Sequence, residues 1–109
     1  MSQESGFRRA SVEEAKRLIE DEGYELIDVR EDWEWQRGHI PGARHVVLSQ
    51  IIGNPRGQKF GEKVVFQCLV GERSALASEM AVALGVPSVV NMEGGFNAWK
   101  AAGLPVEKP

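Results

Sequence analysis

Cys68, the only cysteine of this 109-residue chain, is the residue best placed for chemistry. It directly follows Lys63–Gln67, a short apolar and β-branched run that predicts a buried strand. A helical run rich in Ala, Leu and Met begins soon after it, near Ser74. At such a position, between a strand and a helix N-terminus, backbone N–H groups and the helix dipole can stabilise a thiolate or hold a small anion. We therefore expect Cys68 to act as a nucleophile.

The loop after Cys68 contains residues suited to holding a thiolate. Backbone N–H groups from Leu69 to Ser74 can curl around the sulfur as a set of donors. Gly71 permits unusual backbone dihedrals, and Arg73 carries a fixed charge with planar donors that suit an oxyanion. The alternative is a buried cysteine that serves only as a small hydrophobe. It is less favoured because the position, the glycine, the arginine and the serine occur together.

The spacing from cysteine to arginine separates two kinds of chemistry. Four residues lie between Cys68 and Arg73. Cysteine-dependent phosphatases resemble one another in having one residue more at this point, which makes a loop wide enough for phosphate. The shorter spacing therefore favours attack on sulfur.

Capping and hydrophobic periodicity predict the elements that position this loop. Ser11 and Glu14 have the spacing of a capping box, at the start of a helix that ends near Glu22. The stretch Ile51–Gly61 is rich in Gly, Asn, Pro and Arg, and we therefore expect it to be an exposed connection. The other expected elements are strands at Phe7–Ala10, Tyr24–Val29, His45–Leu48, Lys63–Gln67 and Ser88–Asn91, a helical turn at Glu31–Gln36, and helices at Ser74–Leu84 and Phe96–Ala102.

The alternation of strands and helices predicts the α/β class, with a parallel sheet covered by helices on both faces. Sites in such open sheets form beyond the carboxyl ends of the strands. Asp28 and Arg30, Cys68, and Met92–Gly95 all follow expected strands. We expect them to meet at one edge of the sheet. Residues 1–109 are expected to form a single domain.

Composition argues against several classes of function. A net charge of −3 gives no broad basic field for nucleic acid or an acidic membrane. No apolar run approaches the ~20 residues that span a bilayer, and the first residues lack the pattern of a secretory signal. A lone cysteine cannot form an internal disulfide, and no Cys/His cluster offers a zinc site. A reducing, cytoplasmic location is therefore expected.

Three segments together resemble the rhodanese-homology domain family over most of the chain, from about Phe7 to Val106. Each alone would be a weak signal, but the combination is specific. The segments are Leu26–Arg30 followed by Gly38–Ala43, similar to the family's N-terminal signature; Cys68–Ser74, which matches its active loop; and Glu93–Trp99, similar to its C-terminal signature.

The resemblance implies a rhodanese-like open five-stranded parallel sheet with helices on both faces. It also implies a sulfurtransferase in which the Cys68 thiolate takes sulfane sulfur from a donor such as thiosulfate and passes it to a thiol or cyanide. No metal or organic cofactor is expected. Besides the small donor and acceptor, a sulfur-relay protein is a candidate partner, and neither nucleic acid nor membrane is expected. The substrate-binding residues implied are Leu69, Val70, Gly71, Glu72, Arg73 and Ser74.

The resemblance also implies that Asp28, Arg30 and His39 shape the active site. Asp28 and Arg30 are expected to form an ion pair or a hydrogen-bond network at the strand end rather than to touch substrate. His39 is expected to hydrogen-bond the backbone near the turn, in preference to transferring a proton.

The loop departs from many active relatives in two ways. Leu69 and Val70 are apolar where those relatives carry basic or small polar residues, and Glu72 adds a negative charge. We therefore expect thiosulfate to be a poor donor, with a persulfide or a partner protein in its place. Two other functions stay open: a non-catalytic or regulatory protein-binding module on the same fold, and a cysteine-based phosphatase or arsenate reductase. The sequence leaves the oligomeric state open.

Overall fold

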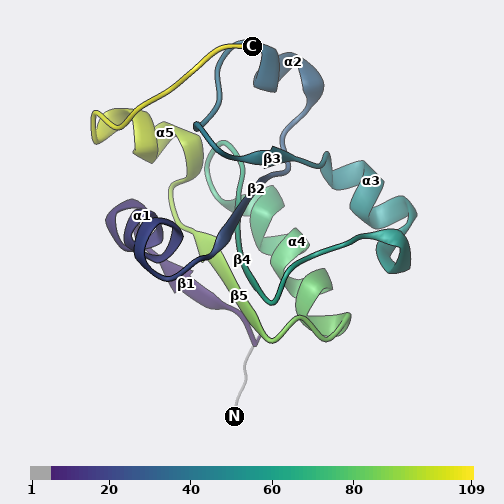
Figure 1. Ribbon diagram of the computed structural model, residues 1–109. Coiled ribbons are helices and arrows are strands. Elements are labelled where there is room, and N and C mark those ends of the chain that lie inside the picture. Colours follow the sequence, from purple (N-terminus) through teal and green to yellow (C-terminus); the bar gives the residue numbers. More distant parts are fainter. Residues whose placement is uncertain (1–5) are drawn as a thin grey trace.

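The computed structural model describes residues 6–109, in which one sheet of parallel strands has the order β1-β5-β4-β2-β3 (Figure 1). All four neighbouring pairs run parallel, so the prediction of an open parallel sheet with five strands is confirmed. The strands are β1 (Arg8–Ala10), β2 (Glu25–Asp28), β3 (Arg44–His45), β4 (Lys63–Gln67) and β5 (Ser88–Met92).

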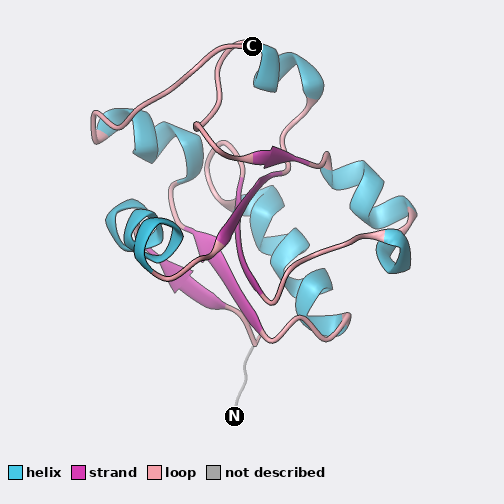
Figure 2. Ribbon diagram, in the orientation of Figure 1, coloured by secondary structure: helices cyan, strands magenta, loops and turns pink. Residues whose placement is uncertain are grey.

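Helices cover both faces of the sheet (Figure 2). Side chains alternate along β4, so that Val64 and Phe66 pack toward α3 and α4, whereas Val65 packs toward α1 and α5. No helix within residues 6–109 is long and apolar enough to cross a bilayer. The helices are α1 (Val12–Asp21), α2 (Asp32–Gln36), α3 (Leu48–Gly53), α4 (Glu72–Ala83) and α5 (Gly95–Ala101), with a 3-10 turn at Pro55–Gly57.

The segment after β3 differs from the prediction. A strand is expected at His45–Leu48, but β3 ends at His45 and α3 already begins at Leu48. The expected exposed connection at Ile51–Gly61 also starts inside α3. The burial of Ile51 explains the helix, because its side chain is fully buried in the cluster under α4 and this packing outweighs the local turn signals.

The start of α1 shows half of the predicted capping box. The Ser11 hydroxyl accepts a hydrogen bond from the Glu14 N–H at 3.1 Å, as expected. The Glu14 carboxylate does not reach back and instead lies 3.5 Å from Arg8 and 3.3 Å from Arg17. The prediction of the second half of the box is therefore wrong, because cations compete for that carboxylate.

Candidate active site

Strand β4 delivers Cys68 to the carboxyl edge of the sheet, where the ends of β2 and β5 also lie. The Phe96 N–H at the start of α5 donates to the Cys68 carbonyl at 2.7 Å. The Arg30 guanidinium, two residues beyond β2, lies 4.2 Å from the centre of the Phe96 ring. The three segments predicted to meet at one edge are thus in contact.

The Cys68 sulfur is almost completely buried and lies within reach of three donors. The Gly71 N–H donates to Sγ at 3.1 Å, and the Ser74 N–H and hydroxyl each donate at 3.4 Å. Burial raises the pKa of the thiol, but the Ser74 hydroxyl and the N–H groups of Ser74, Gly71 and Val70 together outweigh it. The net effect is a pKa below the ordinary value, and the thiolate is correspondingly stabilised.

A glycine makes this arrangement of N–H groups possible. Gly71 has φ of +105°, in the region that side chains disfavour, and it immediately precedes the first residue of α4. The Asn91 side-chain amide, from β5, donates to the Gly71 carbonyl at 3.1 Å and to Glu93 at 2.9 Å. The loop residue whose N–H faces the sulfur is therefore held from the neighbouring strand. Sequence reasoning missed Asn91, although a polar side chain in an otherwise apolar strand is a usable signal.

The N-terminus of α5 holds the first part of the loop. The Phe96 and Asn97 N–H groups donate to the carbonyls of Cys68 and Leu69, at 2.7 and 3.0 Å. Gly95 makes the close approach possible, because a Cβ at this position would collide with both carbonyl groups. Within the segment Glu93–Trp99, Gly95 thus allows backbone to pack on backbone.

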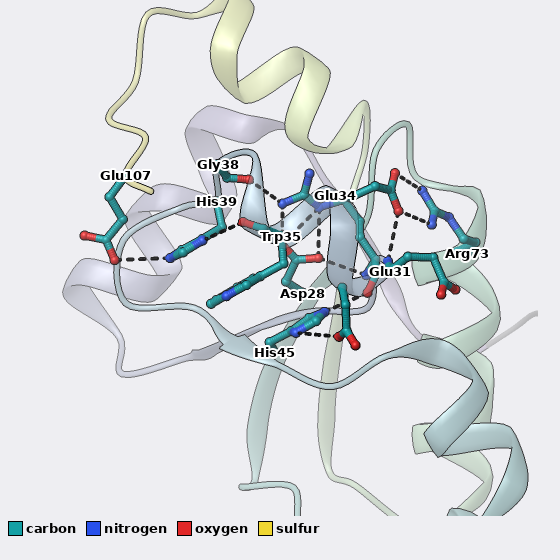
Figure 3. A network of polar contacts seen from close by, with 11 residues as sticks. Asp28, Glu31, Glu34, Trp35, Gly38, His39, His45, Arg73 and Glu107 are labelled. Carbon is teal, nitrogen blue, oxygen red and sulfur yellow. Dashed lines mark hydrogen bonds and ion pairs between the residues drawn. The ribbon is translucent and has the colours of Figure 1, made fainter. Parts of the chain in front are cut away.

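Arg73 belongs to the Cys68 loop but forms its ion pair with a residue of α2. Its guanidinium donates to both oxygens of the buried Glu34 carboxylate, at 2.7 and 3.0 Å (Figure 3). The hydrogen bond from Arg73 is the main reason that the pKa of Glu34 lies below its ordinary value, with burial opposing it. Sequence reasoning missed Glu34, whose position within an expected helical turn gave no sign of its partner.

Asp28 and Arg30 form a buried ion pair at the end of β2, with exposed side-chain fractions of 0% and 2%. The Arg30 Nε lies 3.0 Å from both carboxylate oxygens, and Nη2 lies 2.9 Å from Oδ2. Nη2 also donates to the Gly38 carbonyl at 2.8 Å. The strand-end ion pair expected from the sequence is present, and it ties β2 to the turn before His39.

His39 uses both ring nitrogens within the same corner of the molecule. Nδ1 lies 3.1 Å from the Trp35 carbonyl, and Nε2 lies 3.4 Å from the Glu107 carboxylate (Figure 3). The imidazole stacks on the Trp35 indole, with ring centres 3.5 Å apart. A backbone contact near the turn is what the sequence led us to expect.

The remaining loop residues lie at the rim. Leu69 is half-buried and packs against the cluster beneath α1 and α5. Val70 is 50% exposed, and Glu72, the first residue of α4, is exposed. The loop therefore surrounds the sulfur with Gly71 and Ser74, presents an apolar and an acidic side chain to solvent, and directs its arginine to Glu34.

No group of three or more His, Cys, Asp or Glu side chains in residues 6–109 is arranged to hold a metal ion.

Comparison with known proteins gives consistent findings. The sequence model of the Rhodanese-like domain matches residues 11–102. The chain is 32% identical over 97 residues to the thiosulfate sulfurtransferase GlpE of Pseudomonas putida, a match that covers 89% of this chain and 88% of that protein.

Solved structures with the same fold have been described with different activities. The human single-domain sulfurtransferase TSTD1 superposes with a TM-score of 0.76 at 25% identity, over 85% of this chain and 95% of that one. A Rhodopseudomonas palustris protein of unknown function, described as a possible tyrosine phosphatase, superposes with a TM-score of 0.81 at 31% identity, over 94% and 86% of the two chains.

Proposed function

This chain belongs to the rhodanese-like domain family and is a sulfurtransferase, and we propose that the transferred sulfur is carried as a persulfide on Cys68. The observation that carries the proposal is the sulfur of the only cysteine, held by three donors from Gly71 and Ser74. These donors stabilise negative charge on sulfur both before and after the transfer.

The reaction divides into two displacements on sulfur. The Cys68 thiolate attacks the outer sulfur of a donor such as thiosulfate, a new S–S bond forms, and the old S–S bond breaks as sulfite leaves with its electron pair. An acceptor thiolate or cyanide then attacks the outer sulfur of the persulfide, and Cys68 leaves as thiolate. Because Cys68 is only 1% exposed, a donor with a terminal sulfur reaches it more easily than a bulky group does.

The rim of the loop bears on the identity of the donor. Arg73 is already paired with Glu34, Val70 is half exposed, and Glu72 is exposed. A rim of this kind favours a donor less negative than thiosulfate. A persulfide, on a small thiol or on a sulfur-relay protein, is therefore the preferred donor in this proposal, and a reducing cytoplasm is where such persulfides and a free Cys68 thiol coexist.

Phosphatase chemistry has less support at this site. A cysteine phosphatase needs a loop wide enough for phosphate and a guanidinium directed at it. Here four residues separate Cys68 from Arg73, and the guanidinium is engaged by Glu34.

Mass spectrometry of the intact protein tests the proposal. After treatment with a sulfane-sulfur donor and removal of excess reagent, we expect a one-sulfur adduct that fragmentation assigns to Cys68 and that cyanide or dithiothreitol removes. The matched variant Cys68→Ser should gain no sulfur and should turn over no donor. If no donor, including a small-molecule persulfide, yields the adduct on wild type, the persulfide proposal is wrong.

A further inference from the structure

The ion pair between Glu34 and Arg73 joins the Cys68 loop to α2, and neither of the two displacements on sulfur uses it directly. Arg73 is the second residue of α4, and Glu34 lies in α2. The two side chains meet through two short hydrogen bonds, with exposed fractions of 34% for Arg73 and 8% for Glu34. Paired hydrogen bonds of this kind fix both the distance and the plane of the guanidinium.

Contacts from its own segment hold the Glu34 carboxylate in place. Its Oε1 also accepts a hydrogen bond from the Glu31 N–H at 2.9 Å. The chain on either side of α2 is secured by the Arg30 side chain, which bonds to Asp28 before the helix and to the Gly38 carbonyl after it. Glu34 is therefore held in position to neutralise Arg73.

Arg73 lies within electrostatic reach of the reacting sulfur. It is adjacent to Ser74, whose N–H and hydroxyl both contact Cys68 Sγ. The hydrogen bond to Glu34 is the main cause of the raised pKa of Arg73, and the charge on Cys68 is a further cause. A cation this close would attract an anionic donor if its charge were not already neutralised.

We propose that Glu34 is a specificity-determining residue, which neutralises Arg73 and so makes the site discriminate against dianionic thiosulfate relative to less charged donors. The proposal rests on the proposed function, because it concerns the donor that the Cys68 thiolate attacks. It assigns Glu34 no contact with substrate. Glu34 acts through Arg73, and its effect is on the choice of donor.

Two donors that differ mainly in charge can measure this choice. Thiosulfate carries two negative charges and loses sulfite when Cys68 takes its outer sulfur. Methanethiosulfonate carries one negative charge and loses methanesulfinate in the same displacement. In both cases the thiolate charge passes to the persulfide, and the leaving group departs with the electron pair of the broken S–S bond. The ratio of kcat/KM for the two donors therefore reports the charge preference of the site.

The test variant is Glu34→Gln, which removes the charge and keeps the shape and an oxygen that can accept from Arg73. We expect the ratio of kcat/KM for thiosulfate to that for methanethiosulfonate to rise about fivefold, mainly through a lower KM for thiosulfate. The rise should shrink as salt is added, because screening weakens an electrostatic effect. A purely structural role for Glu34 would instead lower kcat/KM for both donors alike.

Two further variants act as controls. Glu62→Gln removes the same charge from an exposed position at the far end of β4, about 20 Å of strand away, and should leave the ratio unchanged. The double variant Glu34→Gln with Arg73→Gln should lose the gain in thiosulfate preference, because the freed cation is no longer present.

The outcomes separate this inference from the function on which it rests. If wild type forms the persulfide and turns over methanethiosulfonate, but Glu34→Gln leaves the donor ratio unchanged or lowers it, the inference about Glu34 is overturned and the persulfide route stands. The inference is overturned in the same way if the double variant keeps the gain. If wild type forms no persulfide with any sulfane-sulfur donor, including a small-molecule persulfide, the proposed function fails first.

Discussion

The Ser74 hydroxyl has an unusual position for a serine, because it donates to a sulfur atom from inside a helix and both residues are buried. Burial raises the pKa of Cys68, and this hydroxyl makes the largest of the opposing contributions. Removing one hydrogen bond to a charged acceptor changes its free energy by about 1.5–3 kcal/mol. At the scale of single residues, the reactivity of the thiol therefore depends strongly on Ser74.

Ser74→Ala should move the pKa of Cys68 upward, because it removes the largest of the contributions that lower that pKa. The thiolate is the reactive form and accumulates as pH rises through the pKa. Alkylation by iodoacetamide should therefore become fast at a higher pH in the variant than in wild type, with a lower rate at neutral pH. The pH profile of the alkylation rate measures this shift.

Ser78→Ala is the matched control for Ser74→Ala. The Ser78 hydroxyl is also buried in α4, but it donates to the Ser74 carbonyl at 2.8 Å and not to the sulfur. Its loss should leave the pH profile nearly in place. Equal profiles for wild type and Ser74→Ala would contradict the role assigned to the Ser74 hydroxyl.

At the scale of elements, the site depends on how closely α5 packs on the loop after β4. Two N–H groups of α5 bond to the Cys68 and Leu69 carbonyls, and Gly95 leaves no side chain between the two backbones. The loop is therefore held from both sides, by the start of α4 and by the start of α5.

Gly95→Ala should destabilise the protein and lower the rate of persulfide formation, because the new methyl group would collide with the Cys68 and Leu69 carbonyls. Gly103→Ala is the control: Gly103 also has positive φ, but nothing lies within 4 Å of a Cβ there. We expect Gly95→Ala to cost at least ~2 kcal/mol more in free energy of unfolding than Gly103→Ala, measured by urea denaturation. Equal costs would mean that backbone strain, and not the close approach, makes the glycine necessary.

Local sequence signals predicted the elements better than they predicted the contacts between them. Cys68 could be identified because a strand, a nucleophile, a glycine and a helix follow one another within a short stretch of chain. Glu34 could not, because its partner Arg73 is 39 residues away and the pair exists only when α2 packs beside the start of α4. The prediction of an exposed connection from Ile51 onward was wrong for a similar reason, since only the packed core shows that this residue anchors a helix.

At the scale of the whole molecule, the buried pair of Asp28 and Arg30 joins separate parts of the fold. Arg30 bonds to the end of β2, to the Gly38 carbonyl in the turn after α2, and lies over the Phe96 ring of α5. A buried cation left without its carboxylate is costly, so the pair matters more once formed than its net contribution to stability suggests.

Asp28→Asn should therefore lower the free energy of unfolding by about 3 kcal/mol, because it leaves Arg30 buried without a counter-charge. Glu25→Gln is the comparison, since it breaks a partly exposed pair with Arg44 and should cost less than ~1 kcal/mol. Chemical denaturation of the two variants beside wild type gives both values. If Asp28→Asn lowers the free energy of unfolding no more than Glu25→Gln does, the buried pair does not hold these parts of the fold together.

The burial of the Cys68 sulfur also affects how fast a bound sulfur atom is passed on. A sulfur atom stored on a residue with 1% exposure meets large acceptors rarely and small ones often. The rate at which the Cys68 persulfide transfers its outer sulfur then depends on the width of the acceptor. Cyanide should therefore remove the sulfur faster than a bulky thiol does, which the release of sulfur from the donor-treated protein measures.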